Sequence, residues 1–564
     1  MSLNLPAILL ASVLAPGWTS YGGNAQHTAE YLGSSQSLQQ DIWHAGMDDD
    51  RNYYGTDVLA HYASPVVTPR NTVVYAYRFN EINPDGSTNY DNWHMIARAG
   101  QNGNEQWTVK TDYSAPLVWP TDWTSVFPLA TVPVTGPSGI TTGAACAAAG
   151  GTILIKADAD SPTSALNRVA FYTTFADYTA NAAAYAPIKV NTPITSDGNG
   201  NIYFGYIVTA AVPSSLSALG SGGLVIMNAS NHTSRFVSVQ AMGVGGGMGQ
   251  IQDNAAPALS NDGTSVYIAL CPTLQPGWAG PGYMAKLDVG TLQTDASVAM
   301  MDPGVPGYPA VLLNESSASP MVAPDGHVFM GAFRYNYGES HGWMLQYDGN
   351  LSSTDANGKT FPVGAFGWDD TASIVPANIV ANYTGSAPYL LLTKYNDYAD
   401  FNYEDSNAIG DNKVALLDPT SNSTGVDRQT GVAVMNVVQA VLGITPDYDF
   451  SSPGGPPIGV REWCINSAVV DINKKSAIIN SEDGHVYRWD FASNKLTEHK
   501  LLEPATGEAY TSTVIGPDGT IYAINNSVLF AIGNNPIVAS KRSSKVNDLT
   551  AENLKVAEAA LLML

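Results

Sequence analysis

The strongest constraint on this sequence is a short motif, clearest in SPMVAPDGHVFMGAF at residues 319–333. Pro-Asp-Gly at 324–326 interrupts an apolar run that resumes at once. The Asp-Gly pair predicts a hairpin turn, because Gly tolerates positive φ and Asp tolerates left-handed geometry. A strand with one wet face alternates apolar and polar residues, whereas residues 328–333 are apolar throughout. The motif therefore predicts a hairpin whose second strand is buried on both faces.

The same plan recurs eight times along the chain. In each copy a small residue or Pro begins a short apolar strand, a polar turn follows that usually carries Asp-Gly or Asn-Gly, and a second apolar strand holds an aromatic residue. The copies span residues 64–77, 130–158, 192–206, 256–270, 319–333, 371–395, 467–490 and 511–533. A chain of 564 residues exceeds one ordinary domain, so this repetition indicates a fold that grows by adding units.

A second element follows most of the copies: an apolar strand, then Asp or Asn, then a polar turn. It occurs at residues 94–107, 223–234, 284–293, 343–352, 414–425 and 486–496. Each unit therefore contains at least three strands, and we expect a weaker fourth strand on the outside. Four antiparallel strands per unit, with no helical segments between them, are typical of a β-propeller blade rather than of a β-helix, whose coils are shorter.

An all-β propeller of four-stranded antiparallel blades also explains the continuous apolar strands. Blades pack face to face around an axis, so their inner strands are covered on both sides. Two stacked sandwiches would predict alternating strands instead. The eight copies favour eight blades, with seven as the alternative.

The two ends of the repeat region indicate how the ring closes. The last unit has clear inner strands up to Ile532, and DIWHAGM at residues 41–47 resembles a lone outer strand. We expect this N-terminal strand to pair into the last blade, because such closure removes free edges. The predicted organisation is an N-terminal apolar segment at 1–16, a single propeller domain at 17–540, and a linker with a C-terminal amphipathic helix at 541–564.

Two stretches differ from the repeats. Residues 5–15, LPAILLASVLA, are too short to span a bilayer but have the length of a signal-peptide core; without a basic start, retention as a strand or short helix is the alternative. Within residues 549–564, Leu554, Ala557 and Leu561 have helical spacing, which predicts a short helix docking on the propeller, with an oligomer or membrane-surface contact as alternatives. We expect an exported protein, extracellular or periplasmic.

The charge balance limits the partners. With 49 acidic and 25 basic residues the net charge is −24, which opposes binding to nucleic acid or to anionic lipid. The acidic excess suits solubility outside the cell, or a surface that attracts cations or a basic partner. Cys146, Cys271 and Cys464 are far apart and form neither a disulfide framework nor a metal set, so we expect buried small apolar side chains.

The repeats resemble the pyrroloquinoline-quinone-like (PQQ-like) repeat of the quinoprotein alcohol dehydrogenase-like fold, in which a blade runs from a Ser-Pro start through Asp-Gly to a closing Thr-Gly and Trp. GWTSYGGNAQHTAEY at residues 17–31 resembles the opening of such proteins, where a Trp, a Gly-Gly pair and a polar His/Asn-Thr precede the first blade. The resemblance covers residues 17–535 and implies the fold. It leaves the function open, because the superfamily contains quinone-dependent dehydrogenases and cofactor-free scaffolds.

The dehydrogenases of this superfamily have features that can be looked for in the sequence. The resemblance implies adjacent cysteines over the cofactor, Glu, Asn and Asp around calcium, and a Trp floor under the quinone. No Cys-Cys pair occurs, and the blade-closing pattern is clean only at Gly103–Trp107. Some related quinone enzymes lack the cysteine pair, so its absence disfavours the enzyme without excluding it, and no catalytic residue carries over by position.

A candidate calcium site lies in the longest gap between blade starts. Asp397, Asp400, Asn402 and Glu404 are close together on a predicted loop. Hard oxygen ligands at short spacing can wrap Ca²⁺, which accepts six to eight oxygens, although the spacing does not match an EF-hand. The alternative is a solvated acidic loop.

Four tryptophans are candidate ligand-binding residues at a mouth of the ring: Trp119, Trp123, Trp368 and Trp463. Exposed aromatic rings beside carboxylates suit stacking on a sugar ring or on a flat cofactor. Ordinary blade packing is the alternative for each. The scattered histidines include no H-E-x-x-H pair, which disfavours a catalytic zinc.

Two functions follow from these patterns. The first is an exported, non-catalytic binding or scaffold propeller that uses a loop-rich face, with insertions around 120, 210, 275 and 395–465, to bind a protein, glycan or surface polymer. The alternative is a PQQ- and calcium-dependent oxidoreductase acting on alcohols or sugars, with the quinone on the propeller axis.

Overall fold

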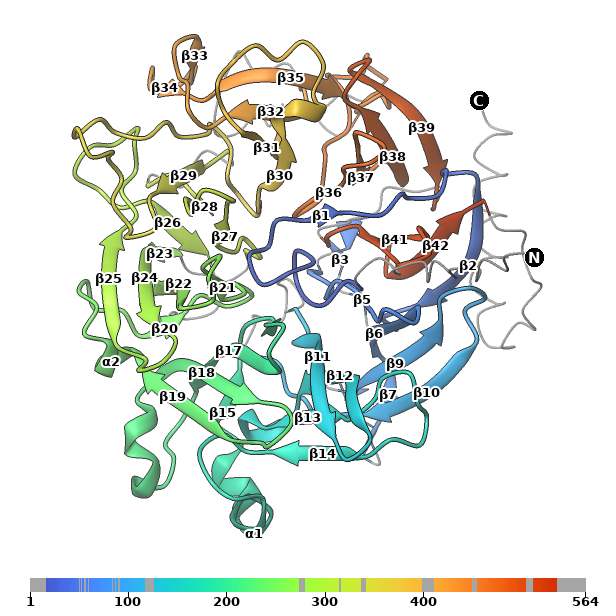
Figure 1. The fold of residues 1–564 in the computed structure, drawn as a ribbon, viewed down its shortest axis with the longest axis vertical. Helices are drawn as coiled ribbons and strands as arrows, with labels where there is room; N and C mark the ends of the chain where they lie inside the picture. Colours follow the sequence, from blue (N-terminus) through green and yellow to red (C-terminus); the bar gives the residue numbers. More distant parts are fainter. Residues whose placement is uncertain are drawn as a thin grey trace, which may run out of the picture.

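The computed structural model describes residues 17–534 except 50, 52, 55–56, 59, 84, 87, 90–91, 117–125, 273–278, 314–315, 336–340, 398–409, 449–453 and 504–510. Eight sheets stand side by side around a central axis (Figure 1). The eight blades are those of the eight sequence copies, so the prediction of an all-β, eight-bladed propeller is confirmed. The predicted N-terminal segment 1–16 and C-terminal helix lie outside the described residues.

The strands of blades 1 to 6 run from the axis outward in sequence order. Blade 1 contains β5 (Val66–Val67), β6 (Thr72–Arg78), β9 (Trp93–Ala99) and β10 (Glu105–Lys110). Blade 2 contains β11 (Leu129–Gly136), β12 (Gly139–Ala147), β13 (Ile153–Lys156) and β14 (Leu166–Val169). Blade 3 contains β15 (Ile188–Val190) and β16 (Thr195–Ser196), which both pair with β17 (Asn201–Val208), then β18 (Gly222–Asn228) and β19 (Ser234–Ser238). Blade 4 contains β20 (Gln250–Ile251) and β21 (Ala258–Leu259), which both pair with β22 (Ser265–Cys271), then β24 (Tyr283–Asp288) and β25 (Thr294–Ala299).

Two of the remaining blades depart from four strands: blade 5 has three among its described residues, and blade 7 has five. Blade 5 has three strands among its described residues, β27 (Met321–Val322), β28 (Val328–Ala332) and β29 (Trp343–Tyr347). Blade 6 contains β30 (Ser373–Pro376), β31 (Tyr389–Tyr395), β32 (Lys413–Asp418) and β35 (Asn436–Leu442). Blade 7 contains β36 (Val469–Asp471), β37 (Ser476–Asn480), β38 (His485–Asp490) and β39 (Lys495–Leu501), with β1 (Glu30–Tyr31) parallel to β36.

Blade 8 closes the ring. It contains β40 (Val514–Ile515), β41 (Ile521–Asn525) and β42 (Val528–Gly533) from the end of the repeat region, with β2 (Gln40–Gly46) as its outermost strand. Strand β2 pairs antiparallel with β42, so the closure predicted from residues 41–47 is confirmed. Because both ends of the repeat region share one sheet, opening the ring requires this sheet to separate.

Short elements decorate the blades. Three small hairpins pair β3 (Tyr53–Tyr54) with β4 (Asp57–Val58), β7 (Glu81–Ile82) with β8 (Thr88–Asn89), and β33 (Gly425–Val426) with β34 (Ala433–Val434). A separate two-stranded sheet pairs β23 (Ala279–Pro281) with β26 (Val311–Leu313), which are separated in the sequence by β24 and β25. The helical turns are η1 (Ala149–Gly151), α2 (Val239–Met242), η2 (Ser214–Leu219) and η3 (Ala377–Ile379). No helix in the described part of the chain is both long and apolar enough to cross a membrane.

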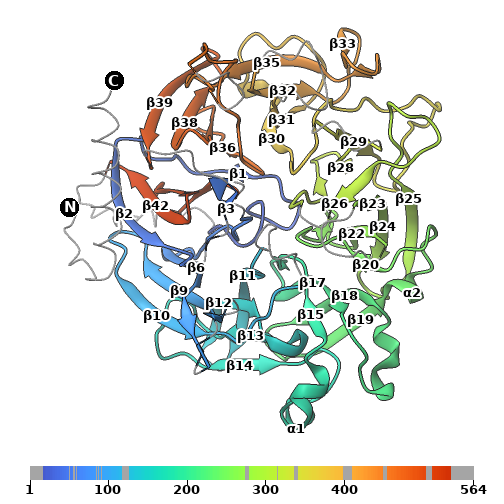
Figure 2. The ribbon, with the colours of Figure 1, turned by 180° about the vertical axis from the view of Figure 1, so that it is seen from behind.

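One helix was not predicted from the sequence. Helix α1 (Phe175–Tyr185) lies between blades 2 and 3 and projects from the rim of the ring in both views (Figures 1 and 2). The Thr174 side chain caps it by accepting a hydrogen bond from the Asp177 N–H. The expectation of no helical segment between blades was therefore wrong here, because a good N-cap and an Ala-rich run stabilise a helix outside the blade cores.

The apolar strands of the repeat face two neighbours. In β28, Val328 and Met330 pack in a core cluster shared with blade 4 residues such as Tyr267, whereas Phe329 packs in a different cluster with Ile374 of blade 6. Successive side chains of a strand point to opposite faces, so each face of the blade has its own core. This arrangement is the reason why residues 328–333 do not alternate in polarity.

An inner layer of chain lines the axis. Residues 17–31 run past the innermost strands and end in β1, visible as the dark blue segment at the centre of the ring (Figure 1). Backbone carbonyls of this segment accept hydrogen bonds of 2.7–2.9 Å from innermost strands of six blades. The pairs are Val67 to Trp18, Thr131 to Thr19, Leu259 to Ala25, Val322 to Gln26, Ile374 to Thr28 and Val470 to Ala29.

Side chains of the same segment reach the remaining two blades. The His27 ring lies 3.2 Å from the Thr195 hydroxyl of blade 3, and the Tyr31 hydroxyl donates to the Gly516 carbonyl of blade 8 at 2.9 Å. Residues 17–31 therefore contact all eight blades. We call them the axial segment.

The axial segment holds unfavourable backbone conformations. His27 and Ala29 have φ of 63° and 55°, in the left-handed region that costs a non-glycine residue energy. Gly23 has φ of 85°, and a Cβ there would come within 3.0 Å of the Trp18 ring. The bonds to the blades hold these conformations in place.

We predict that His27→Phe destabilises the protein. His27 is fully buried and burial lowers its pKa to about 4, so the neutral ring donates from Nδ1 to the Pro320 carbonyl at 2.7 Å and accepts from Thr195 at Nε2. Phe leaves both partners buried and unsatisfied, at a cost of about 1–3 kcal/mol each. Denaturant unfolding measures the loss; His499→Phe on the exposed side of β39 is the control, and equal midpoints for the two variants would contradict the role of the axial segment.

Candidate functional site

The antiparallel pairing sorts the connections between two faces of the ring. Turns between the first and second strands of a blade lie on one face, which we call the turn face. Connections between the second and third strands, and those leading to the next blade, lie on the other, which we call the loop face. The insertions predicted around residues 120, 210 and 275 belong to loop-face connections, and the one predicted at 395–465 does so only in part, because residues 419–435 connect the third and fourth strands of blade 6. The predicted loop-rich face therefore exists.

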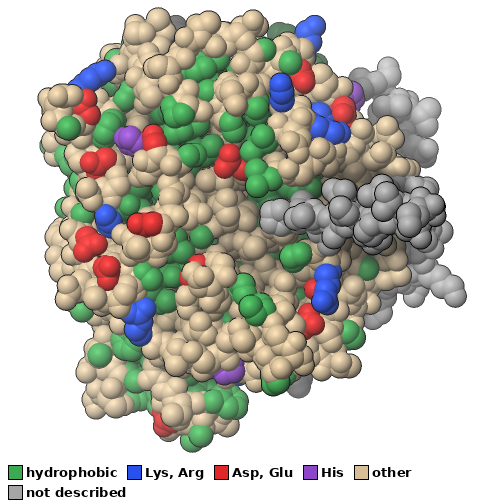
Figure 3. Space-filling view, viewed as in Figure 1, with side chains coloured by type: hydrophobic (Ala, Val, Ile, Leu, Met, Phe, Trp, Pro, Cys, Tyr) green, Lys and Arg blue, Asp and Glu red, His purple; other side chains and the backbone are tan. Residues whose placement is uncertain are grey.

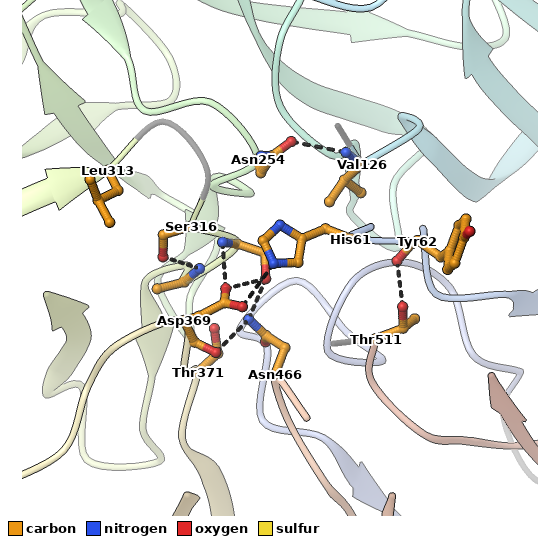
Figure 4. Close-up of polar contacts among 12 residues, drawn as sticks. His61, Tyr62, Val126, Asn254, Leu313, Ser316, Asp369, Thr371, Asn466 and Thr511 are labelled. Carbon is orange, nitrogen blue, oxygen red and sulfur yellow. Dashed lines mark hydrogen bonds and ion pairs between the residues drawn. The ribbon is translucent and has the colours of Figure 1, made fainter. Parts of the chain in front are cut away.

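A buried polar cluster lies at the axis, where loop-face connections enter the blades (Figure 4). The Nε2 atom of His61 lies 2.8 Å from Oδ2 of Asp369, and the two side chains are 3% and 2% exposed. The other carboxylate oxygen, Oδ1, accepts from the backbone N–H and the hydroxyl of Ser317, each at 2.6 Å. Connections into blades 1, 5 and 6 thus meet at one carboxylate.

The axial segment is tied into this cluster. The Tyr21 hydroxyl contacts the Ser317 carbonyl at 3.1 Å, the Thr371 hydroxyl at 2.8 Å and the Asn466 amide oxygen. The Asn466 amide nitrogen donates to the Ser317 hydroxyl at 2.8 Å. We call His61, Asp369, Ser317, Thr371, Asn466 and Tyr21 the axial cluster.

The pKa values of two adjacent carboxyl groups of the site, Asp369 and Asp370, are shifted in opposite directions. Burial raises the pKa of Asp369, but His61, Lys394 and the Ser317 bonds outweigh it and hold that pKa well below the usual range. Burial raises the pKa of Asp370 well above its usual value, and Lys394 only partly opposes this effect. The buried Lys394 lies beside this pair, with its side-chain nitrogen 5.7 Å and 6.0 Å from the ring centroids of Phe366 and Trp368.

The described residues do not fit a calcium cage at the axis. Both oxygens of Asp369 already have partners, and burial raises the pKa of Asp370 well above its usual value. No group of at least three His, Cys, Asp or Glu side chains in the described ranges could hold a metal ion. Cys146, Cys271 and Cys464 are buried, as the sequence predicted, and the Cys464 thiol donates to the Glu482 carboxyl group at 3.4 Å.

The loop face carries a pocket of about 70 Å³ between blades 5 and 6. None of its lining residues belongs to an innermost strand. It is lined by His341, Ala365, Tyr395, Asn396, Asp397, Lys413, Val426, Asp427, Arg428 and Gln429. We call it the loop pocket.

Ion pairs shape the loop pocket. Arg428, whose side chain is 58% exposed, lies 2.5 Å from the buried carboxylate of Asp397. The buried Arg334 lies 2.6 Å from Asp427 and 2.5 Å from the Gln429 amide oxygen, with its guanidinium 4.6 Å from the Trp343 ring centroid. These bonds fix the tip of the β33–β34 hairpin, which reaches the loop face from between β32 and β35.

The predicted site residues fall in three places. Asp397 lines the loop pocket, where it pairs with Arg428; Asp400, Asn402 and Glu404 lie outside the described residues, so the calcium site stays a prediction. Trp119 and Trp123 also lie outside the described residues. Trp368 is half-buried beside Phe333, with ring centroids 5.4 Å apart, and Trp463 is fully buried against Tyr487, which is ordinary blade packing.

The sequence did not indicate the axial cluster. His61, Ser317 and Asp369 have no mutual spacing that a motif search detects, because only the ring brings these connections together. A weak signal was present: each lies just before the first strand of a repeat copy, and such positions converge on a propeller axis.

Comparison with known proteins bears on the fold. No protein-family model and no curated protein sequence matches the chain. The quinohemoprotein alcohol dehydrogenase from Comamonas testosteroni has a similar structure, with a TM-score of 0.51 and 10% identity over 93% of this chain and 82% of that one. A europium-containing methanol dehydrogenase gives a TM-score of 0.49 and 10% identity over 90% of this chain and 89% of its own.

This chain has the eight-bladed propeller fold of the quinoprotein alcohol dehydrogenases. The resemblance seen in residues 17–535 is therefore confirmed at the level of the fold. At 10% identity the quinoprotein fold carries no residue roles across.

We predict that Asp369→Asn costs about 3–5 kcal/mol of unfolding free energy, because it removes the buried carboxylate that lies 2.8 Å from the buried His61 ring. Replacing both residues, as Asp369→Asn with His61→Gln, removes both sides of this contact together and costs less than the sum of the single changes. A double-mutant cycle by denaturant unfolding measures the coupling, and additive costs would show that the two side chains act independently.

We predict a pH-dependent stability from Asp253, which precedes the Asn254 of Figure 4. Burial raises its pKa to about 7, partly opposed by bonds from Asn191 and Gln250. The folded state holds this proton more tightly than the unfolded chain, whose pKa is about 3.9. Protonated Asp253 therefore stabilises the folded state fully below about pH 4, and this stabilisation is lost as the pH rises to about 7. The loss amounts to at most about 4 kcal/mol of unfolding free energy.

Denaturant unfolding between these pH values tests the assignment. Asp253→Asn is expected to flatten the slope, and Asp295→Asn on the exposed side of β25 is the control. An unchanged slope in Asp253→Asn would assign the titration to another group.

Proposed function

We propose that this chain is an exported, non-catalytic binding propeller that holds a protein, glycan or surface polymer on its loop face. The observation that supports this function is that the axial cluster and the loop pocket occupy different parts of the loop face. Its axial end is filled by the hydrogen-bonded axial cluster, while its described pocket lies away from the axis, between blades 5 and 6. A propeller that binds with its loops needs an accessible surface and no reacting group at the axis.

The surface charge is consistent with such partners. Acidic and basic side chains are scattered over the face in Figure 3, and neither kind gathers into a patch. A nucleic acid would need a basic patch, and the net charge of −24 opposes it. A neutral or weakly charged polymer meets no such barrier.

The PQQ- and calcium-dependent oxidoreductase is the alternative function. The quinoprotein fold and the position of Lys394 beside Trp368 favour it, whereas the Asp369 carboxylate, already bonded within the axial cluster, opposes a calcium cage. No reaction step follows from the described residues.

We predict that blocking the loop face abolishes ligand binding. Val426, at the loop pocket, is 59% exposed, and Ile140, on the turn face, is 75% exposed. Trp at either position is tolerated because the side chains face solvent. In surface plasmon resonance against neutral and acidic polysaccharides, Val426→Trp weakens binding at least about tenfold, and Ile140→Trp leaves it unchanged.

The same protein preparation separates the alternative. It is mixed with PQQ and Ca²⁺, passed through gel filtration and assayed for dye reduction with alcohols and sugars. Retained quinone absorbance with dye reduction would establish the oxidoreductase, and equal loss of polysaccharide binding in both Trp variants would overturn the loop-face assignment.

A further inference from the structure

Three cationic side chains lie in or beside the loop pocket, and only two of them form ion pairs with described residues. Arg428 is paired with Asp397, and Arg334 with Asp427. The Lys413 side chain forms no ion pair or hydrogen bond with a described residue; its ammonium lies 5.9 Å from the centroid of the Tyr395 ring. In a chain with 49 acidic and 25 basic residues, a pocket lysine with no acidic partner among the described residues is unexpected and indicates an anionic group as its complement.

Two exposed aromatic side chains lie near the β33–β34 hairpin, whose tip lines the loop pocket. Tyr308 and Tyr335 are 48% and 41% exposed, and their ring centroids are 4.2 Å apart. Both belong to loop-face connections, Tyr308 between blades 4 and 5 and Tyr335 between β28 and β29. Large aromatic side chains that stay exposed together are characteristic of binding surfaces.

Direct contacts connect the tyrosine pair to the loop pocket. Tyr335 follows Arg334, whose guanidinium bonds the pocket-lining Asp427 and Gln429. On the other side, a Cβ at Gly304 would come within 2.7 Å of Thr430, at the tip of the same hairpin, and Asp302 of that turn accepts the Tyr335 N–H at 2.5 Å. The hairpin tip therefore contacts the two loops that carry the aromatic pair, and it also lines the pocket that contains Lys413.

We propose that the loop pocket and the tyrosine pair form a binding site for a short saccharide that carries a carboxylate, such as a uronic-acid oligomer. A sugar ring packs on Tyr308 and Tyr335 through its apolar C–H face, as exposed tyrosines favour. The carboxylate enters the pocket and accepts charge-assisted hydrogen bonds from the Lys413 ammonium and the exposed side of the Arg428 guanidinium. This site rests on the proposed loop-face binding function and gives it a ligand class.

The net charge restricts the ligand further. At −24 the protein repels a dense polyanion at long range, whereas one carboxylate beside Lys413 gains a short-range contact. The site therefore favours a ligand with few charges and excludes highly sulfated chains and nucleic acids.

Isothermal titration with the trimer of galacturonic acid, and with its methyl ester as the matched neutral ligand, tests the proposal. The wild type binds the acid, and the ester binds at least about tenfold more weakly, because a hydrogen bond to a charged group is lost. Lys413→Gln weakens binding of the acid by the same factor without affecting the ester, Lys413→Arg retains it, and Tyr308→Ala weakens both ligands. Lys495→Gln on the exposed part of β39 makes the same charge change elsewhere and leaves binding unchanged.

Equal affinities for acid and ester, or full acid binding in Lys413→Gln, would overturn the carboxylate assignment. Neutral polysaccharides that bind the wild type and lose affinity in Val426→Trp, with no binding of the acid trimer, would overturn the acidic ligand and leave the loop-face function intact. The absence of any polysaccharide binding would overturn the saccharide site and leave a protein as the loop-face partner. Matching thermal unfolding midpoints show that each variant is folded.

Discussion

The bonds between the axial segment and the innermost strands are the constraint on which the rest of this propeller depends. An innermost strand presents one row of backbone groups to the axis, and unpaired backbone groups in a buried place are costly. Trp18 to Ala29 supply carbonyls to six blades, and His27 and Tyr31 reach the other two. The segment joins the blades from inside the ring, while β2 joins the last blade from outside. Binding sites are therefore left to the loop face and the rim.

Much of the fold could be predicted from the sequence because its physical cause is local and repeated. Apolar runs such as 328–333, broken by Asp-Gly, specify a hairpin covered on both faces, and eight copies specify a ring. The departures come from segments outside that pattern. Helix α1 depends on the local cap at Thr174, and the β33–β34 hairpin packs against blade 5 through Val434, where the described residues form no fourth strand. The structure of such insertions depends on contacts specific to each of them, and the repeated motif does not predict these contacts.

The candidate site was less predictable because its residues meet only in three dimensions. Asp397 and Trp368 were identified from local clustering, and both lie on the loop face. The acidic clustering that suggested calcium did not reveal that Asp397 pairs with Arg428. His61 and Asp369 are far apart in sequence, and neither residue type alone distinguishes a buried ion pair from a surface group. Lys413 stands out only after the ion pairs of its arginine neighbours are known.

The Lys413 contact acts on a charged ligand at short range, whereas the net charge of the protein acts at long range. Measurements at different salt concentrations distinguish these two effects. At physiological ionic strength, screening limits exposed charges to about 8 Å, so the overall charge of −24 acts mainly on the approach of a ligand. The contact at Lys413 is partly buried and is screened less. Added salt therefore weakens two opposing effects in the wild type, and its net effect on affinity has no simple sign. Replacing Lys413 with a neutral residue changes the total charge only slightly, so the difference between the two proteins at each salt concentration isolates the local contact. A difference that persists at high salt would place the carboxylate inside the pocket, since a purely long-range attraction would disappear.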